Sequence, residues 1–386
     1  MDNDAFRDSS AGKVINTQKG YFAFIPNPLP PKITYDESFV QLLSEASRNL
    51  GNLNGVGMQL PNPALLIIPY VRKEAVLSSR IEGTQTSLSE LFYFEAARKA
   101  EQKKEAGRTD VLEVVNYVKA VDYGIKRLGT LPISLRLIKE IHSILMKGVR
   151  GQHLTPGEFR KSQNWIGPGG CTLNDATYVP PPVEAMKDAL SDLEKFIHNR
   201  DALDGLVQCA VTHYQFEAIH PFLDGNGRMG RLLTMIFLCE REYLKYPLLC
   251  LSAYFDRNRS QYYERLLGVS QRGDWPGWIK FFLKAIADES KNAVENSRAI
   301  LALLDNYRKR VEQKRPSMYV FKLLDLISKN PYISIPRTAE ALKTSFHTAK
   351  AAVEKLESMN ILTETTDKER GKIYCAEELL KIFDPK

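Results

Sequence analysis

One segment of the chain, residues 220–231 (HPFLDGNGRMGR), concentrates side chains that could hold a polyphosphate and move a proton. His220 is the natural general base, because imidazole accepts a proton near neutral pH. Arg228 and Arg231 are three residues apart, so on a helix they share one face and could clamp adjacent phosphates. Asp224 would repel phosphate unless a cation bridged the two, which predicts Mg²⁺ between Asp224 and the phosphate oxygens.

The glycines of this segment predict a loop that opens a helix. Gly225 and Gly227 permit positive φ and let backbone amides converge on an anion. A helix that starts near Asn226 would present its unpaired N–H groups and the positive end of its dipole to that anion. The alternative is a tight corner between two helices, in which His220 and Asp224 are caps and the arginines form surface ion pairs.

Residues 225–230 match the dinucleotide fingerprint GxGxxG, but that motif requires a β-strand directly before it. Here the preceding apolar residues recur at helical spacing: Leu206, Val207, Ala210, Val211 and Tyr214. The context is therefore helix–loop–helix, which excludes a Rossmann site. A P-loop is excluded too, since no Gly-Lys-Ser/Thr follows.

The whole segment resembles the signature of the Fic family, HPFxxGNGRxxR, and matches it at every specified position. The resemblance extends over roughly residues 20–300 and implies a mainly α-helical Fic core with a small β-hairpin flap. It also implies a protein adenylyltransferase, which moves AMP from ATP to a Ser, Thr or Tyr hydroxyl and releases pyrophosphate. The target would be another protein or the chain itself.

The resemblance gives each residue of the motif a role. His220 would deprotonate the target hydroxyl, Asp224 would hold Mg²⁺ against the α- and β-phosphates, and Arg231 would grip the γ-phosphate. Further along the chain, Asn258 is expected to contact the adenine and Tyr262 to pack beside it, although an Asn in a polar loop more often caps a helix. The motif residues expected to bind ATP are Gly225, Asn226, Gly227, Arg228, Met229, Gly230 and Arg231.

A second motif lies upstream, where residues 78–83 (SSRIEG) fit the family's inhibitory pattern [S/T]xxxE[G/N]. The resemblance implies that Ser78 and Glu82 belong to an inhibitory helix. A carboxylate that reached Arg231 would form a charge-assisted pair in the place of the γ-phosphate, and ATP would then bind in a non-productive pose. The alternative is an ordinary glutamate at a helix end.

Glycines and prolines surround two short β-like pieces, residues 164–166 and 176–179, and predict a small hairpin. The hairpin resembles the family's flap, which would align the target segment by strand addition. The residues expected to dock the target are Asn164, Trp165, Ile166, Thr177, Tyr178 and Val179.

The rest of the chain up to residue 313 reads as helices that would surround this site. Four prolines predict an irregular arm over residues 1–35. Four parts are expected: 1–105 with the arm and the inhibitory motif, 106–300 as the catalytic core, 301–316 as a linker, and 317–386 as a further domain. Apolar periodicity predicts helices from 38 onward and over 63–80, 88–104, 110–127, 135–147, 183–199, 203–219, 232–239, 259–271 and 276–313, the last with a bend near residue 287.

The C-terminal part has the pattern of a winged helix-turn-helix domain. Helices are expected over 318–329, 335–342 and 345–359, and strands over 362–366 and 372–375. This pattern suggests DNA binding, but residues 315–386 carry 12 basic and 10 acidic side chains, whereas a DNA reader normally shows a strongly basic face. A module for protein interaction or homodimer formation therefore stays an equal alternative.

Composition bounds the class of protein. Hydrophobic residues make up 44% of the chain, enough for a folded core, and the net charge of +7 permits nucleic-acid contact without requiring it. The cysteines lie apart, with no CxxC pair, which argues against a disulfide framework or a zinc site. With no secretory signal and no apolar stretch of membrane-spanning length, we expect a cytoplasmic protein without a membrane partner.

Two other functions fit the same motifs. One is a DNA-binding transcriptional regulator whose Fic core only senses a nucleotide, although a pure sensor has no need of a base at His220. The other is removal of AMP from a modified protein at the same site, with Glu82 positioning the attacking water.

Overall fold

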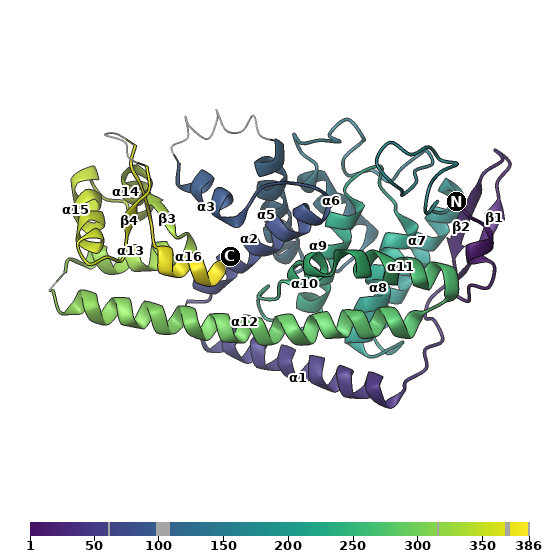
Figure 1. Ribbon diagram of the computed structural model, residues 1–386, viewed down its shortest axis with the longest axis horizontal. Helices are drawn as coiled ribbons and strands as arrows, with labels where there is room; N and C mark the ends of the chain where they lie inside the picture. The colour runs from purple at the N-terminus through teal and green to yellow at the C-terminus, as the bar shows by residue number, and fades with distance from the viewer. Residues whose placement is uncertain (61, 98–108, 315, 367–370, 385–386) are drawn as a thin grey trace.

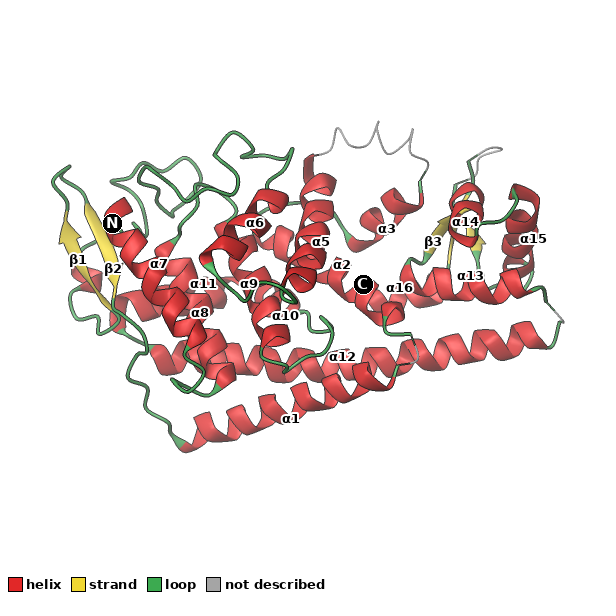
Figure 2. Cartoon of the chain, turned by 180° about the vertical axis from the view of Figure 1, so that it is seen from behind, coloured by secondary structure: helices red, strands yellow, loops and turns green. Residues whose placement is uncertain are grey.

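The structure is a computed structural model that describes residues 1–60, 62–97, 109–314, 316–366 and 371–384. The molecule is elongated and mainly helical, as the sequence predicts (Figure 1). Its longest helix, α12 (Trp275–Glu312), runs along one side, and α1 (Glu37–Gln59) packs beside it. Strands lie near both ends of the molecule (Figure 2). In the parts described, no helix has the length and apolar character that crossing a membrane demands.

Two helices that are buried on nearly every face form the centre of the catalytic region. They are α8 (Gly205–Ile219) and α9 (Asn226–Glu240), and both are apolar on nearly all sides, which suits helices enclosed by others. Helices α2, α5 and α6 contact α9, and α7 and α12 contact α8. The bounds of the helices around this pair are α2 (Ala64–Ile81), α3 (Leu88–Ala96), α5 (Thr109–Arg127), α6 (Leu135–Leu145), α7 (Val183–His198), α10 (Leu251–Arg257) and α11 (Arg259–Arg272).

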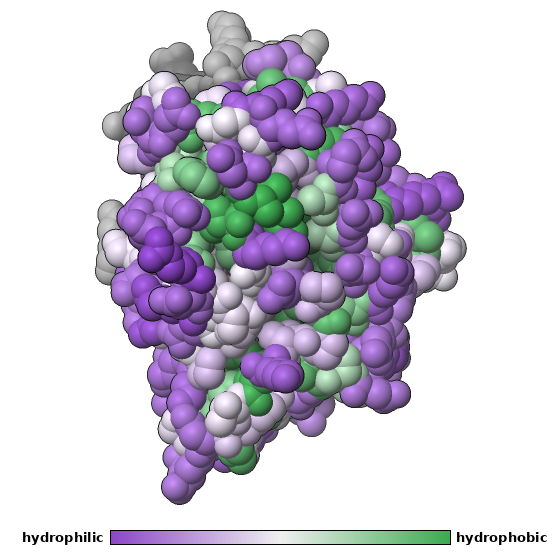
Figure 3. All heavy atoms as spheres, turned by 90° about the vertical axis from the view of Figure 1, so that its right-hand side faces the viewer, coloured by the Kyte–Doolittle hydropathy of each residue, from purple (hydrophilic) through white to green (hydrophobic). Residues whose placement is uncertain are grey.

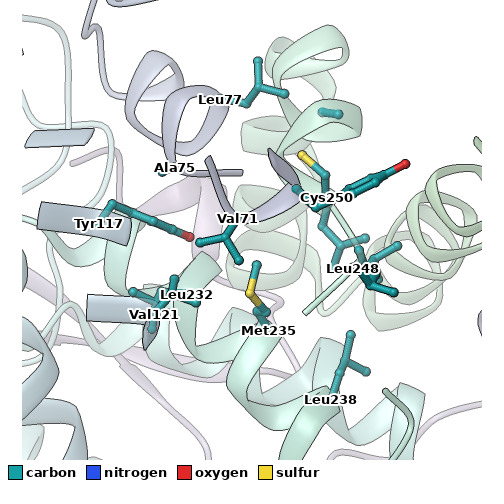
Figure 4. Packing of buried hydrophobic residues seen from close by; sticks show 14 of the residues in the cluster. Val71, Ala75, Leu77, Tyr117, Val121, Leu232, Met235, Leu238, Leu248 and Cys250 are labelled. Atoms are coloured by element: carbon teal, nitrogen blue, oxygen red, sulfur yellow. The ribbon is translucent and has the colours of Figure 1, made fainter. Parts of the chain in front are cut away.

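The packing of α2 decides where the residues after it lie. Val71 and Ala75 of α2 are buried against the side chains of α5 and α9, including Tyr117 and Leu232 (Figure 4). Burial of a side chain such as that of Val71 contributes about 1.5–3 kcal/mol, so these contacts fix the helix firmly. Apolar packing alone therefore holds the last turn of α2 against the N-terminal half of α9.

The N-terminal arm is ordered, which corrects the expectation of an irregular segment over residues 1–35. After a short 3₁₀ turn, η1 (Asp4–Phe6), strands β1 (Gly12–Asn16) and β2 (Phe22–Pro26) form an antiparallel hairpin. The prolines that suggested irregularity stand at the end of β2 and beyond it, where they cost no pairing within the hairpin.

The C-terminal unit contains the three helices that the sequence predicts, together with a sheet. The helices are α13 (Met318–Lys329), α14 (Ile335–Leu342) and α15 (Phe346–Glu357). Strands β4 (Thr363–Glu364) and β5 (Ile373–Cys375) correspond to the two expected pieces, and β5 also pairs with β3 (Tyr332–Ser334), so the antiparallel order is β3-β5-β4. Strand β3 and the final helix, α16 (Glu377–Phe383), were not expected. The winged-helix assignment stays a prediction.

Helix α12 continues through the segment that was expected to be a linker. Residues 301–312 are its C-terminal part, and the helix is unbroken at Ala287, where a bend was expected. Ala287 is fully buried and its carbonyl accepts a hydrogen bond from Asn49 Nδ2 of α1 at 3.1 Å, so packing along α1 supports the helix at this point. The expected helix 88–104 ends at residue 96, and residues 98–104 lie outside the described part of the chain.

Candidate functional site

The motif forms the turn between α8 and α9, as the helix–loop–helix interpretation predicts. His220 ends α8 in the left-handed region with φ 48°, and Gly225 precedes α9 with φ 80°. A side chain at Gly225 would be strained at this φ, and its Cβ would lie 2.7 Å from Met146 Sδ. The element directly before the glycines is helix α8 and not a strand, so the structure agrees with the rejection of a Rossmann site.

Asn226 locks the loop with its side chain. Its Oδ1 accepts the Phe222 N–H at 2.8 Å and its Nδ2 donates to the Phe222 carbonyl, also at 2.8 Å. Asn226 is buried, so both partners are shielded from water. The side chain is thereby occupied within the loop, and the backbone N–H at the start of α9 is what Asn226 can offer to an anion.

Replacing Asn226 by alanine should lower the free energy of unfolding by about 1–3 kcal/mol, because the buried N–H of Phe222 would lose its partner and its carbonyl would keep only Asn164 Nδ2. Urea unfolding followed by circular dichroism measures this change. Asn226→Asp keeps the acceptor and loses the donor, so it should cost less. An alanine variant as stable as the parent would contradict the locking role.

A buried histidine of α6, His142, also holds the motif loop, and it was not identified from the sequence. His142 Nδ1 accepts the Gly157 N–H at 2.9 Å, so the ring proton is on Nε2, which donates to the Asp224 carbonyl at 2.9 Å. The ring stacks on Phe222 with centroids 3.6 Å apart. Burial lowers the pKa of His142 to about 4, which keeps it neutral in this role. His142 is a positioning residue, and nothing in its local sequence marks it.

Two further side chains hold the backbone of His220. Arg160 Nε donates to the His220 carbonyl at 3.0 Å, and Asn164 Nδ2 donates to the same carbonyl at 3.1 Å. Asn164 Nδ2 also lies 2.8 Å from the Phe222 carbonyl. These contacts offset the cost of the left-handed conformation at His220. Asn164 was expected on the target-docking flap, but its side chain faces the motif loop.

The His220 imidazole lies at the wall of a cavity of about 650 Å³. Its Nδ1 is 3.2 Å from the Glu217 carbonyl, so Nδ1 carries the proton and Nε2 keeps a free lone pair. Burial lowers the pKa of His220 to about 4, which leaves the ring neutral and able to accept a proton. The lining of this cavity also includes Glu82, Trp165, Ile166, Thr177, Tyr178, Glu217, Gly227, Arg231, Arg259, Tyr262 and Tyr263.

Arg231 joins the two sequence motifs across the cavity. Its Nη2 lies 2.6 Å from Glu82 Oε1, its Nε donates to Ser78 Oγ at 2.9 Å, and Nη2 also donates to the Ser78 carbonyl at 2.9 Å. Burial favours the neutral form of Glu82, but Arg231 outweighs burial and lowers the pKa of that carboxyl. Glu82 is therefore a carboxylate anion that is paired with the guanidinium of Arg231.

Gly227 lies at the point where Glu82 reaches the first turn of α9. A Cβ built there would be 2.2 Å from Glu82 Oε1 and 3.1 Å from Arg231 Nη1. Glycine at this position therefore lets an anion approach the helix backbone closely, as the sequence predicts for an anion site.

Arg228 makes a different ion pair from that of Arg231, so the two guanidinium groups do not meet on one anion in this conformation. Arg228 is buried, and its Nη1 lies 3.1 Å from Glu113 Oε2 on α5. Its Nη2 is 3.8 Å from Asp224 Oδ1. Glu113 was missed by the sequence reasoning, since a single carboxylate within a regular helix carries no signal.

The surroundings of Asp224 suit a magnesium ion that is shared with a nucleotide. The side chain is 32% exposed, and Oδ1 accepts the Gly225 N–H at 2.6 Å, which orients the carboxylate at the start of α9. Among the residues that the structure describes, no group of three or more His, Cys, Asp or Glu side chains could enclose a metal. Mg²⁺ is commonly held by one or two carboxylates together with substrate phosphates, so one partly exposed carboxylate fits this ion.

The two residues expected near the adenine differ in position. Asn258 Nδ2 donates to the Tyr254 carbonyl at 2.9 Å at the C-terminal end of α10, which is the capping role that was the alternative. Tyr262 is buried, lines the cavity and places its hydroxyl 2.8 Å from His213 Nε2. The structure thus brings Tyr262 to the cavity and uses the Asn258 side chain in a helix cap.

The expected hairpin flap is reduced to a single bridge, in which Ile166 and Tyr178 exchange backbone hydrogen bonds of 2.8 and 3.0 Å. Strand pairing does not extend, because Pro168 and Pro180, which stand at the next hydrogen-bonding positions, have no N–H. The Val179 carbonyl accepts the Phe24 N–H of β2, and Tyr178 is buried with its hydroxyl on the Ala218 carbonyl. Trp165 and Ile166 remain exposed, at 41% and 38%. Figure 3 shows the end of the molecule that carries β1 and β2, where hydrophobic residues gather within a mostly hydrophilic surface.

Comparison with known proteins gives a consistent result. The family model described as Fic/DOC family N-terminal matches residues 40–126, and the model described as Fic/DOC family matches residues 132–238, together about half of the chain. The crystal structure of a Fic family protein from Desulfovibrio desulfuricans superposes on 90% of this chain. The match includes 98% of that protein and has a TM-score of 0.57 at 19% sequence identity. This likeness concerns the fold.

Curated relatives share the same region. A protein of Aquifex aeolicus named "Probable protein adenylyltransferase" is 28% identical over 55% of this chain and 58% of its own length. "Protein adenylyltransferase Fic" of Aedes aegypti is 30% identical over 42% of this chain and 29% of its own length. The chain thus matches less than two thirds of each of these relatives. With both family models aligned to α1 through α9 and the motif at the turn they share, the chain belongs to the Fic/DOC family.

Proposed function

We propose that this chain transfers AMP from ATP to a hydroxyl side chain of a protein, or of itself, releases pyrophosphate, and is restrained by Glu82. The observation that carries the proposal is the cavity in which His220 and Arg231 meet at the start of α9. One wall offers a neutral imidazole with a free Nε2, and another offers a buried guanidinium that already holds an anion. The names of the curated relatives support the same chemistry.

In the reaction, the hydroxyl oxygen of the target attacks the α-phosphorus of ATP. The new bond joins that oxygen to the α-phosphorus, the bond from the α-phosphorus to the bridging oxygen breaks, and pyrophosphate leaves with the electron pair. His220 Nε2 takes the hydroxyl proton, while the Glu217 carbonyl holds Nδ1 and keeps the ring in the reactive tautomer. Proton removal by such a positioned base is typically worth about 10²–10⁴-fold in rate.

The remaining side chains bind and orient. Arg231 would grip the γ-phosphate, and the N–H groups at the start of α9 would face the phosphates. Asp224 would hold Mg²⁺, which when bound neutralises phosphate charge. Trp165, Ile166 and Thr177, which line the mouth of the cavity, would dock the target chain.

Inhibition follows from the contact between the two motifs. Glu82 holds Arg231 through a charge-assisted hydrogen bond, so the γ-phosphate would have to displace a carboxylate from the same guanidinium. Because α2 is anchored by buried apolar contacts, Glu82 stays close to Arg231 without a separate binding partner. ATP would enter with its phosphates misplaced, and transfer would be slow.

The test is intact-mass analysis of the full chain after incubation with ATP and Mg²⁺. A gain of one adenylyl group, in the chain or in an added target protein, is the expected result for the parent after long incubation and for a Glu82→Gly variant sooner. A chain that binds ATP and yields no adenylylated product in either form would contradict the proposal.

An ion pair at the surface helps to hold the last turn of α2, and so adds to the inhibition by Glu82. Arg80, in the last turn of α2, places Nε and Nη2 3.1 and 2.5 Å from Asp256 Oδ2. Because the Arg80 side chain is about half exposed, the pair is worth roughly 0.2–1 kcal/mol. Asp256→Asn should therefore raise the rate of self-modification by about 1.5- to 5-fold, less than a change at Glu82. A gel assay with labelled ATP measures it, and Asp192→Asn, in an exposed pair on α7, is the control that should change nothing.

A further inference from the structure

A second carboxyl group stands in the cavity beside Arg231, and neither motif accounts for it. Glu217 lies in the last turn of α8 and lines the same cavity as His220, Glu82 and Arg231. Its Oε1 is shielded from solvent and has no hydrogen-bond partner among the described residues. A carboxylate left in that state would be costly, since a buried charge needs a partner.

Backbone space is kept for this carboxyl on the neighbouring helix. A Cβ built at Gly230 would lie 2.3 Å from Glu217 Oε1. Glycine at 230 therefore lets the Glu217 side chain lie against the first turns of α9, one residue before Arg231. The arrangement places two carboxyl groups, those of Glu82 and Glu217, around one buried guanidinium.

One buried guanidinium can balance one carboxylate, and a second carboxylate nearby is disfavoured by its like charge. Glu82 holds the close contact with Arg231 at 2.6 Å, so Glu217 is the carboxyl that stays protonated. In agreement, burial, with Glu82 adding to it and Arg231 opposing it, raises the pKa of Glu217 to about 8.

The histidines, the tyrosines and Glu82 around Glu217 do not titrate between pH 6 and 9. Burial lowers the pKa of His213 to about 3 and that of His220 to about 4, and it raises the pKa values of the tyrosine hydroxyls. The titratable and charged groups in question are His213, Tyr214 and His220 on α8, Arg231 on α9, Glu82 after α2, Tyr178 near the flap bridge, and Arg259, Tyr262 and Tyr263 on α11.

We propose that Glu217 matches the charge of the site to its occupant, binding a proton when another anion lies on Arg231 and releasing it to pair with Arg231 when none does. The inference rests on the proposed function, since the second anion in the active state is the triphosphate of ATP. With Glu82 absent and no nucleotide bound, Glu217 is the remaining carboxylate beside Arg231 and keeps the guanidinium in place. When the triphosphate arrives, Glu217 takes up a proton and no longer repels the phosphates.

The test measures that proton directly. Isothermal titration of the Glu82→Gly protein with α,β-methylene ATP and Mg²⁺ at pH 8, in HEPES and in Tris, gives the number of protons bound with the nucleotide. The Glu82→Gly protein should take up between about half a proton and one proton more than the Glu82→Gly, Glu217→Gln protein. Its apparent Kd should also rise by up to about tenfold per pH unit above pH 8, and that of the Gln variant should not.

Glu240→Gln in the Glu82→Gly background is the matched control, because Glu240 lies at the far end of α9 and pairs with Arg200. It should leave proton uptake unchanged. Equal uptake with and without Glu217 would overturn the inference while leaving the proposed function intact. Failure of the Glu82→Gly protein to bind the analogue would overturn the proposed function and the inference with it.

An infrared difference spectrum of the Glu82→Gly protein guards against a folding defect at position 217. In this protein Glu217 is not mutated, so a folding defect caused by a substitution at position 217 cannot arise. Addition of the analogue should produce the carbonyl band of a newly protonated carboxylic acid. Absence of that band would contradict the inference, whatever the behaviour of the Gln variant.

Discussion

Replacing Glu82 by glycine should raise the rate of AMP transfer at least about tenfold. The change removes the carboxylate from Arg231 Nη2 and frees the guanidinium for the γ-phosphate. A hydrogen bond to a charged group is worth about 1.5–3 kcal/mol, and about 1.4 kcal/mol corresponds to a factor of ten. The measurement is the initial rate of self-modification with labelled ATP, or of modification of a target protein once one is found.

Two further readouts separate relief of inhibition from general loosening. Glu82→Gln keeps the size of the side chain and loses its charge, so its rate should lie between those of the parent and the glycine variant. The glycine variant without nucleotide should have a lower Tm, because Arg231 loses its close contact with Glu82 and Glu217 can replace that contact only after it gives up its proton. Addition of MgATP should raise the Tm of the glycine variant by more than it raises the Tm of the parent. An unchanged rate from a detectable parent rate would show that Glu82 is not inhibitory.

The parts of the site that could be predicted from the sequence are those encoded locally. The helix–loop–helix around the motif follows from apolar spacing before it and glycines within it, and Gly225 has the positive φ that its position suggested. Glu82 and Arg231 are 149 residues apart in the sequence. Their contact was predicted from the resemblance of two short motifs to those of a known family, because apolar periodicity carries no information about such a contact.

What could not be predicted depends on long-range packing of single residues. His142 and Glu113 reach the motif from α6 and α5, and each is one polar residue in an otherwise ordinary helix. The β1–β2 hairpin could not be predicted because the prolines at its end and beyond it indicate irregular backbone, although they interrupt none of its pairing. The flap was expected as a hairpin, and prolines at the next ladder positions, Pro168 and Pro180, leave it with one bridge.

The role of Asn226 shows a second limit, which concerns side chains within a recognised motif. A motif fixes which residue stands at a position, but the partner of its side chain is set by the loop geometry. The side-chain amide of Asn226 binds the backbone of Phe222, and one guanidinium nitrogen of Arg228 binds Glu113. Residues grouped as phosphate ligands in the sequence therefore divide into those that face the cavity, such as Arg231, and those that hold its frame.

Replacing His220 by alanine in the Glu82→Gly protein should lower the rate of AMP transfer by about 10²–10⁴-fold, because the hydroxyl proton would lose its acceptor. Binding of MgATP should change little, since the imidazole faces the attacking group and Arg231 is untouched. A variant that lost nucleotide affinity in proportion to its rate would point to a binding role instead. Gln163→Ala, at a polar residue that hydrogen-bonds the loop carbonyls of Asn164 and Pro180, is the control for loop damage and should keep most of the activity.

The pH dependence gives an independent check on the same residue. Burial lowers the pKa of His220 to about 4, with Glu82 opposing that shift, so removal of Glu82 leaves the pKa low. A general base works in its neutral form, and kcat/KM reports the ionisation of the free enzyme. In the Glu82→Gly protein, kcat/KM corrected for protonation of ATP should therefore stay level from pH 7 down to about pH 5 and fall only below that. An acid limb centred near the ordinary histidine value of about 6.5 would mean that His220 is solvated and not set in the buried tautomer from which the base mechanism is derived.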